Sequence, residues 1–243
     1  MADFAGEIVC VTGAGTGIGR AVARGFVAEG ARVAFLGRRT EKLEEAAAGL
    51  ALEQVRLCAC DVADRASIGA EMAAIEAAWG PVSILVNNAG INTNPRSVAE
   101  VEPSDWDRTV AINLTGVFNA TRAVLPGMRA RKGGLVITVA SIAGLRASKL
   151  AGAAYSASKH GAVALTHSLN EEELEYGIRA CAICPGEVET PILEQRVVQV
   201  SAERRAAMLQ PEDVAAAALF VARLPPRACV PELVIKPTVQ IFQ

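Results

Sequence analysis

The sequence predicts an α/β fold, with a single doubly wound parallel sheet of about seven strands and helices on both faces. Three observations predict this architecture. Short apolar runs alternate with longer stretches of helical periodicity through most of the 243-residue chain. A glycine-rich loop separates the first apolar run from the first helical stretch. No shift in composition divides the chain, so we expect residues 1–243 to form one domain.

The composition restricts the classes of function. Hydrophobic residues make up 51% of the chain and aromatic residues only 4%, which suits close-packed helices on buried strands. The formal net charge of −2 argues against a nucleic-acid partner, which would need a concentrated basic face. No apolar run has the length of a membrane span, and residues 1–5 lack the basic start of a signal peptide. We therefore expect a cytoplasmic protein with no membrane partner.

The strands are predicted from apolar runs that end at a glycine, a proline or a polar residue. They cover residues 7–12, 31–36, 55–60, 81–86, 133–140, 178–184 and 230–236. Helical spacing predicts helices after residue 19, around Glu41, at 63–79, at about 104–129, at 151–176 and from 211 to the prolines at 225 and 226. Ser104 or Asp105 is expected to cap the 104–129 helix. The mixed segment of about 187–210 is expected to be irregular or short-helical and to form the substrate loop.

The first strand is followed by the pattern Thr12-Gly13-x-x-x-Gly17-x-Gly19. A strand, a glycine loop and a helix in this order let the pyrophosphate of a dinucleotide lie on the helix N-terminus. The pattern therefore predicts a dinucleotide site near the start of the chain.

The second strand ends in Gly37-Arg38-Arg39. In dinucleotide-binding folds a carboxylate at this place accepts hydrogen bonds from the ribose diol of NAD, and it would repel the extra phosphate of NADP. This chain has two guanidinium groups there and no acid before Glu41. We therefore expect NADP (NADPH) as the coenzyme and NAD as the less favoured one. The alternative is that both arginines form only a solvated turn.

Tyr155 and Lys159 are four residues apart, so they share one face of a predicted helix. A tyrosine hydroxyl has a pKa of about 10, and a nearby ammonium lowers it by stabilising the phenolate. The pair is therefore a candidate proton-transfer unit, with the Ser141 hydroxyl at the end of a neighbouring strand; the alternative is an ordinary exposed helix pair. Asn113 lies in the middle of another predicted helix, where asparagine is disfavoured unless its amide is needed locally.

The cysteines and histidines do not form a recognisable metal site. Cys58, Cys60, Cys181 and Cys184 lie in short apolar runs, where cysteine acts as a small core hydrophobe. The two histidines have no metal-like partner spacing. We expect neither a metal nor a disulfide.

Taken together, these residues resemble the short-chain dehydrogenase/reductase family from the first strand to about Thr190. The matching motifs are Thr12-Gly13-x-x-x-Gly17-x-Gly19, Asp61-Val62, Asn87-Asn88-Ala89-Gly90, Asn113, Ser141, Tyr155-x-x-x-Lys159 and Pro185-Gly186.

The resemblance implies a Rossmann fold and a catalytic set of four residues. Tyr155 would be the acid/base, and Ser141 would hold the substrate oxygen. Lys159 would lower the pKa of Tyr155 and bind the nicotinamide ribose. Asn113 would hold a water in a proton relay.

The resemblance also implies coenzyme contacts. Asp61 and Val62 would flank the adenine, and Thr190 would approach the carboxamide. Together with the arginine pair, the expected coenzyme-binding residues are Gly13, Thr16, Gly17, Ile18, Gly19, Arg38, Arg39, Asp61, Val62, Asn87, Ala89, Gly90, Tyr155, Lys159, Pro185, Gly186, Val188 and Thr190.

The expected function is an NADP-dependent oxidoreductase that interconverts a small-molecule ketone or aldehyde and an alcohol by hydride transfer. Residues 91–96, 142–146 and 187–193 would form the substrate walls, and their mixture of apolar and charged side chains does not identify the substrate. One alternative is an NAD-preferring alcohol dehydrogenase of the same family. Another is a non-catalytic nucleotide sensor, which would be expected to lose Tyr155 or Lys159. A third is a lyase resembling halohydrin dehalogenases, which replace the lysine and the nicotinamide site.

Two helices and the family resemblance imply a homo-oligomer, a dimer or a tetramer. The 104–129 helix is apolar nearly all round, and the 151–176 helix is lined with small residues. The last strand, Val230-Pro231-Glu232-Leu233-Val234-Ile235, lacks the Val-Asp-Gly-Gly ending common in the family, which leaves the tetramer contact there open.

Overall fold

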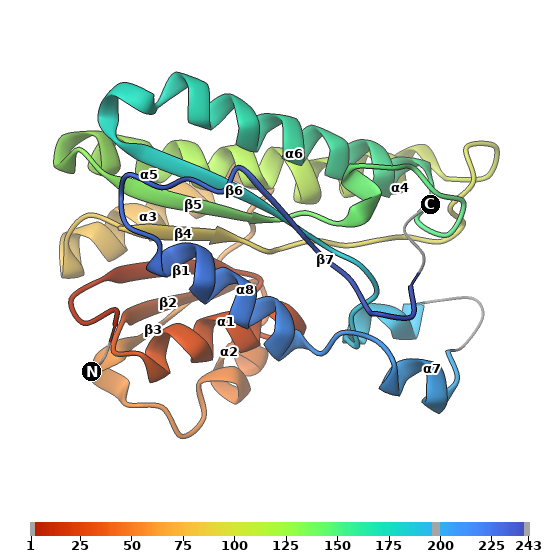
Figure 1. The fold of residues 1–243 in the computed structure, drawn as a ribbon, viewed down its shortest axis with the longest axis horizontal. Coiled ribbons are helices and arrows are strands. Elements are labelled where there is room, and N and C mark those ends of the chain that lie inside the picture. The colour runs from red at the N-terminus through yellow and green to blue at the C-terminus, as the bar shows by residue number, and fades with distance from the viewer. Residues whose placement is uncertain (1–2, 196–199, 241–243) are drawn as a thin grey trace.

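The computed structural model describes residues 3–195 and 200–240, and its centre is one seven-stranded sheet (Figure 1). Every neighbouring pair of strands is parallel, in the order β3-β2-β1-β4-β5-β6-β7. The strands are β1 (Ile8–Thr12), β2 (Arg32–Gly37), β3 (Val55–Ala59), β4 (Ile84–Asn87), β5 (Gly134–Val139), β6 (Ile178–Pro185) and β7 (Glu232–Ile235). The predicted doubly wound parallel sheet is confirmed.

The strand order reverses at the centre of the sheet, between β1 and β4. Val9 of β1 is aligned with Val33 of β2 on one side and with Ile84 of β4 on the other. The chain therefore leaves β1 and β4 toward opposite edges of the sheet, which opens a crevice at the carboxyl ends of these strands.

Helices cover both faces of the sheet. Phe26 of α1, Phe35 of β2 and Val214 of α8 belong to the core on one face, and Ile68 of α3 and Val124 of α5 belong to the core on the other. Figure 1 shows α7 outside these layers, on the side of the molecule where the C-terminus also lies. The helices are α1 (Gly17–Ala28), α2 (Thr40–Ala47), α3 (Arg65–Trp79), α4 (Pro103–Val110), α5 (Gly116–Arg131), α6 (Ala153–Glu172), α7 (Ala202–Ala206) and α8 (Pro211–Arg223).

The third strand is less buried than its apolar sequence predicts. β3 is the edge strand of the sheet, so its side chains alternate between the core and solvent. Cys58 is 1% exposed, whereas its neighbour Leu57 is 38% exposed. The prediction that Cys58 and Cys60 lie in the core is confirmed, but the strand is buried on one face only, because apolar composition does not show which strand lies at the edge.

The helix predicted at 104–129 begins and continues differently from the expectation. Glu102 is the residue that precedes its first turn, and Pro103 takes the first helical position, where its missing N–H has no cost. Ser104 and Asp105 therefore lie inside the first turn and do not cap it. A π-helical turn, Ala111–Thr115, separates α4 from α5. Trp106 and Phe118, two large apolar side chains of this region, are 38% and 37% exposed. The prediction that a second copy of the chain packs against this helix stays a prediction.

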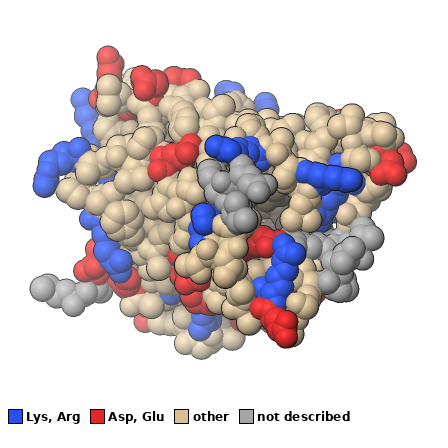
Figure 2. Space-filling view, turned by 45° about the vertical axis from the view of Figure 1, so that its right-hand side comes forward, with Lys and Arg blue, Asp and Glu red and all other residues tan. Residues whose placement is uncertain are grey.

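No helix in the described part of the chain is long and apolar enough to cross a membrane. On the face shown in Figure 2, Lys and Arg side chains are interspersed with Asp and Glu side chains.

An ion pair between a partly exposed arginine and a buried carboxylate connects the end of α5 to the end of α6. Arg129 Nε lies 2.7 Å from Glu173 Oε2, and its Nη2 lies 2.5 Å from Oε1. The Glu173 side chain is 1% exposed, and the Arg129 guanidinium also lies 4.9 Å from the centre of the Tyr176 ring. Since α6 carries Tyr155 and Lys159, this pair helps to fix the helix on which the candidate catalytic residues lie.

The substitution Arg129→Met should lower the free energy of unfolding by about 2–3 kcal/mol, because it leaves a buried carboxylate without its cation. Arg131→Met is the matched control: Arg131 pairs with Glu7 at 4.0 Å, and both side chains are more than a third exposed. That control should change the stability by less than about 1 kcal/mol. Urea denaturation of both variants measures their free energies of unfolding. Equal losses of stability in the two variants would contradict a stabilising role for the Arg129–Glu173 pair.

Candidate active site

A cavity of about 730 Å³ lies at the carboxyl ends of the central strands. Most of its lining comes from the loops that follow β1, β2, β3, β4, β5 and β6. Because β2 and β6 lie on opposite sides of β1 and β4, the cavity extends across the crevice, with Arg38 toward one end and Ser141 toward the other.

Hydrogen bonds between Thr12 and Asn88 hold the ends of β1 and β4 together. Thr12 Oγ1 accepts the main-chain N–H of Asn88 at 3.0 Å and that of Ala89 at 3.1 Å. Asn88 Nδ2 donates to the main-chain oxygens of Thr12 at 3.0 Å and Gly13 at 3.3 Å. The Thr12 side chain is buried, so these bonds fix the loops on both sides of the crevice.

The glycine loop lies directly against the loop that follows β4. Gly13 has φ +67°, and a Cβ there would lie 2.9 Å from Ala89 Cα. A Cβ at Gly19 would lie 2.3 Å from the main-chain oxygen of Gly13. The first turn of α1 can therefore pack against the loop, with its N-terminus at Gly17 on the cavity. This N-terminus presents N–H groups and partial positive charge, which suit a phosphate group.

Basic side chains line the cavity where β2 ends. They are Arg38, Arg39 and Lys42. Lys42 lies on α2 beside the glycine loop, since a Cβ on Gly15 would lie 3.1 Å from Lys42 Cβ. Arg38 Nη1 is 3.9 Å from Asp61 Oδ2, and both side chains are exposed enough to make this a weak pair. This end of the cavity suits an anionic group of the ligand.

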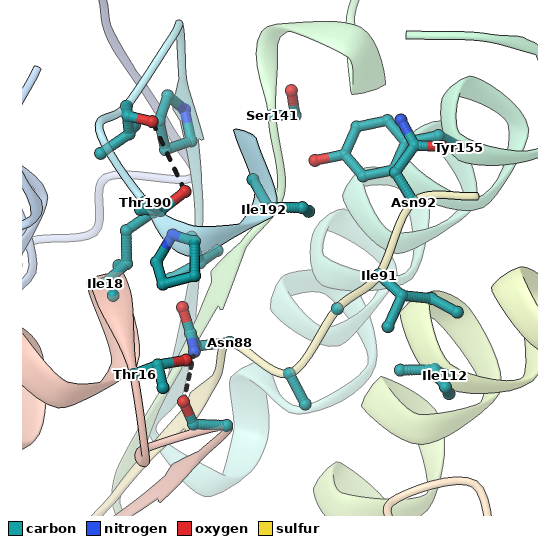
Figure 3. A pocket seen from close by; sticks show the side chains of 18 of the residues that line it. Thr16, Ile18, Asn88, Ile91, Asn92, Ile112, Ser141, Tyr155, Thr190 and Ile192 are labelled. Carbon is teal, nitrogen blue, oxygen red and sulfur yellow. Dashed lines mark hydrogen bonds between the residues drawn. The ribbon is translucent and has the colours of Figure 1, made fainter. Parts of the chain in front are cut away.

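Two hydroxyl groups meet toward the other end of the cavity. Ser141 follows β5, and its Oγ accepts the N–H of Ala143 at 3.1 Å. The Ser141 side chain lowers the pKa of Tyr155, against the effect of burial. Figure 3 shows Ser141 and Tyr155 in the same part of the pocket, with the Tyr155 hydroxyl on the side of Ile192. Lys159 follows one turn later on α6, with Nζ 5.7 Å from the centre of the Tyr155 ring. The two hydroxyls can bind one substrate oxygen between them.

The pKa of Tyr155 is raised, whereas its spacing from Lys159 predicts a lowered one. Burial is the main cause and outweighs the hydrogen bond with Ser141 and the charge of Arg96, both of which lower the pKa. The Lys159 ammonium donates to the main-chain oxygen of Val139 at 2.9 Å. Helical spacing identified the right pair but not the surroundings that decide the sign of the shift.

Lys159 is a buried cation. Its side chain is only 5% exposed, and burial lowers its pKa from 10.5 to about 8. A Cβ on Gly90 would lie 3.5 Å from its Nζ, so the group lies between α6 and the loop after β4. With this pKa, the Lys159 amine is still protonated in most protein molecules at neutral pH.

The hydrogen bonds of the Asn113 amide account for an asparagine in the middle of a helix. It lies in the π-helical turn and is completely buried. Its Oδ1 accepts the N–H of Ile91 at 2.8 Å, and its Nδ2 donates to the Ile91 oxygen at 2.9 Å and to Ser158 Oγ at 3.1 Å. The amide therefore connects the loop after β4 to α6, and π-turns are often found at functional sites. The role of holding a water stays a prediction.

The C-terminal segment contributes to the cavity. Gln240 Oε1 accepts the N–H of Glu187 at 3.0 Å, and Lys236 Nζ donates to the main-chain oxygen of Gln240 at 2.7 Å. On its other side Glu187 pairs with Arg204 of α7 at 3.0 Å. The segment after Pro185 is therefore held from both α7 and the C-terminal turn.

Most of the predicted site residues line this cavity. They are Gly13, Thr16, Gly17, Ile18, Arg38, Arg39, Asp61, Val62, Ala89, Gly90, Ser141, Tyr155, Lys159, Pro185, Gly186, Val188 and Thr190.

Three predicted residues, Gly19, Asn87 and Asn113, are not on the lining. Gly19 is needed for packing of α1, and Asn113 acts through Ile91. Asn87 donates to Thr121 Oγ1 at 3.0 Å, toward α5. The next residue, Asn88, is the asparagine of this motif that lines the cavity, and a coenzyme contact by Asn87 stays a prediction.

Comparison with known proteins identifies the family. A family model described as short chain dehydrogenase matches residues 7–200. The chain belongs to the short-chain dehydrogenase family. This short-chain dehydrogenase is 40% identical over 188 residues to 2,3-dihydro-2,3-dihydroxybenzoate dehydrogenase of Bacillus subtilis, a match covering 76% of this chain and 71% of that protein. The resemblance inferred from the motifs is confirmed, and the chain is an oxidoreductase of this family.

Solved structures agree with this assignment. The closed form of serine dehydrogenase complexed with NADP+ superimposes with a TM-score of 0.86 at 30% identity, covering 97% of this chain and 96% of that one. A 3-ketoacyl-(acyl-carrier-protein) reductase from Brucella melitensis complexed with NADH gives a TM-score of 0.87 at 30% identity, covering 98% and 99%.

The sequence did not identify several lining residues of this short-chain dehydrogenase. Lys42 could have been found, because it lies three positions after Arg39 on a short predicted helix. Arg146 was expected on a substrate wall but is exposed and does not line the cavity. Gln240 has no local signal, since its place depends on the path of the whole chain. The missed lining residues include Lys42, Arg108, Ile112, Ser148, Leu150, Ala151 and Gln240.

The cysteines take no part in a disulfide or a metal cluster in the described structure. All six are free thiols, and only Cys229 is exposed. Within residues 3–195 and 200–240, no group of three His, Cys, Asp or Glu side chains could hold a metal ion.

Because folding lowers the pKa of Lys159 from 10.5 to about 8, the unfolded chain binds more protons between these values. The contribution of Lys159 to stability should therefore rise with pH across this window. The variant Lys159→Met has no titrating group at this position. The free energy of unfolding of the wild type minus that of Lys159→Met should increase by about 2 kcal/mol from pH 7.5 to pH 9.5. Urea denaturation of both proteins at the two pH values measures it. Parallel pH dependences would show that the Lys159 pKa is not lowered.

Proposed function

We propose that this short-chain dehydrogenase is an NADP-dependent oxidoreductase that interconverts a ketone or aldehyde and an alcohol, with Tyr155 as the acid/base. One observation carries the proposal: the Ser141 and Tyr155 hydroxyls meet in a cavity that also contains a glycine loop and the basic group at Arg38. The relatives support it, because their names describe dehydrogenases and reductases, and similar structures hold NADP+ or NADH.

The described residues fit a nicotinamide coenzyme. Close approach of backbone at Gly13 and the N-terminus of α1 at Gly17 suit its pyrophosphate. Asp61 and Val62 would border the adenine, and Lys159 would bind the nicotinamide ribose. When bound, the reduced coenzyme supplies the hydride that reduces the carbonyl carbon.

The protein's own part in the reaction is to bind the carbonyl oxygen and move a proton. Ser141 and Tyr155 would hold that oxygen with their hydroxyls. Tyr155 donates its proton to the oxygen as the alcohol forms, and in the reverse direction its phenolate takes the alcohol proton. Because the Tyr155 pKa is raised, the hydroxyl is protonated at neutral pH, which is the form that reduction requires. Oxidation needs the phenolate and should become faster as the pH rises.

The choice of NADP rests on the charges after β2. No carboxylate occupies the place where it would accept hydrogen bonds from the ribose diol, and Arg38, Arg39 and Lys42 line that end. Use of NAD is the runner-up. It is favoured by the weak pairing of Arg38 with Asp61, which offsets part of the positive charge, and by the NADH complex of the Brucella melitensis relative.

The proposal predicts that NADPH is preferred over NADH by at least about tenfold in kcat/KM, because one charge-assisted hydrogen bond contributes about 1.5–3 kcal/mol. Arg38→Asp should narrow or reverse this preference by removing a cation and adding a carboxylate that repels the phosphate. The measurement is steady-state reduction of a panel of ketones and aldehydes with each coenzyme.

Arg227→Asp is the matched control, because Arg227 is exposed and does not line the cavity. It makes the same change in net charge and should leave the NADPH/NADH ratio within about twofold. Equal or better use of NADH by the unmodified enzyme would show that the arginines form only a solvated turn. Failure to reduce any carbonyl with either coenzyme would count against the reaction itself.

A further inference from the structure

Arg96 carries the basic side chain at the substrate end of the cavity. Three segments line this end beyond the catalytic hydroxyls, residues 91–96, 141–151 and 187–194, together with Gln240. Among the lining residues that the structure describes in these segments, Arg96 is the one with a basic side chain. The acidic ones are Glu187, which pairs with Arg204 at 3.0 Å, and Glu194, which lies exposed on the turn Pro191–Gln195.

The Arg96 guanidinium is held in place by main-chain oxygens. Its Nη1 donates to Leu150 at 2.7 Å, and its Nε donates to Thr93 at 3.3 Å. Its own main-chain oxygen accepts the N–H of Ala153, the first residue of α6, at 3.1 Å. The side chain is therefore ordered before a ligand arrives, and little conformational entropy is lost on binding.

The backbone at Arg96 packs closely against Gly152. A Cβ on Gly152 would lie 2.6 Å from Arg96 Cβ and 2.8 Å from its main-chain oxygen, and Gly152 has φ +84°. The neighbouring Asn92 donates from Nδ2 to the Ala151 oxygen at 3.0 Å. The loop that carries Arg96 thus lies directly against the turn of chain that leads into Tyr155.

The charge of Arg96 acts on the catalytic hydroxyl. It is one of the two influences that lower the pKa of Tyr155 against the effect of burial. Arg96, Ser141 and Tyr155 also line the same cavity. A carboxylate a few bonds from the carbonyl carbon could therefore reach the guanidinium while the carbonyl reaches Ser141 and Tyr155.

We propose that Arg96 binds the carboxylate of the substrate, so that the enzyme acts on oxo acids and the corresponding hydroxy acids. This inference rests on the proposed function, because it assigns the substrate class of the same site. A guanidinium with fixed geometry is the side chain best suited to a carboxylate. The competing explanation is that Arg96 only connects its loop to α6. In that case its loss would weaken the binding of charged and neutral carbonyl compounds equally.

The test compares oxo acids with their methyl esters in complexes that cannot react. The enzyme is saturated with oxidised coenzyme, which has no hydride to give, and titrated with pyruvate, acetoacetate, levulinate and the methyl ester of each. The three spacings cover different distances between carbonyl and carboxylate. For at least one pair the acid should bind at least about tenfold more tightly than the ester, as expected for one charge-assisted hydrogen bond. Isothermal titration calorimetry gives both dissociation constants without any need for turnover.

Substitutions then assign the preference to Arg96. Arg96→Gln should reduce the ratio of ester to acid dissociation constants by about tenfold. Lys149→Gln is the matched control, because Lys149 is exposed, lies one residue from Leu150 and does not line the cavity. It removes the same charge from the same region and should keep the ratio within about twofold. If Arg96→Gln does not fold, Arg96→Lys keeps the charge and should retain part of the preference.

The outcomes separate the two proposals. Esters that bind as tightly as acids to the unmodified enzyme would overturn the assignment of Arg96 and leave the carbonyl site intact. An Arg96→Gln variant that weakens both members of a pair equally would show that the residue only connects the loop to α6. Absence of binding for every acid and ester would also overturn the assignment of Arg96, whereas the proposed function would be overturned only if the whole panel of ketones and aldehydes gave no turnover with either coenzyme.

Discussion

The hydrogen bonds of Thr12 and Asn88 are the interaction on which the rest of the site depends. They join the ends of β1 and β4 at the point where the strand order reverses. Gly13 can then lie against Ala89, which places the N-terminus of α1 on one side of the crevice. The chain after Ala89 continues on the other side, where Asn113 fixes Ile91 and connects it to α6 through Ser158. The glycine loop and the helix that carries Tyr155 are therefore connected through the ends of β1 and β4.

Burial at this frame has opposite effects on two neighbouring groups. It raises the pKa of Tyr155 and lowers that of Lys159, so both are biased toward their neutral forms. A neutral tyrosine is the state that donates a proton. The lysine keeps its charge at neutral pH with the help of the Val139 oxygen. The site thus uses a destabilised buried cation, as functional sites often do.

Sequence reasoning succeeded where the chemistry is local and failed where it depends on the path of the chain. Within the glycine loop, within the arginine pair after β2 and between Tyr155 and Lys159, the residues are only a few positions apart, so spacing alone predicts each of these motifs. Asn87 and Asn88 face opposite directions at a strand end, and the sequence does not show which one faces the crevice. Gln240 reaches Glu187 across 53 positions, and no local pattern contains that information. The sign of the Tyr155 shift depends on burial, which spacing does not reveal.

The central claim is that a hydride passes to a carbonyl carbon while Tyr155 supplies the proton. Single-turnover reaction with coenzyme deuterated at one face of the transferring carbon tests it most directly. The account predicts that deuterium appears on the carbinol carbon from one face only. It also predicts that Tyr155→Phe slows this transfer by about 10²- to 10⁴-fold while coenzyme affinity stays within about twofold. Deuterium lost to solvent, or transfer by the Phe variant at nearly the wild-type rate, would contradict the account.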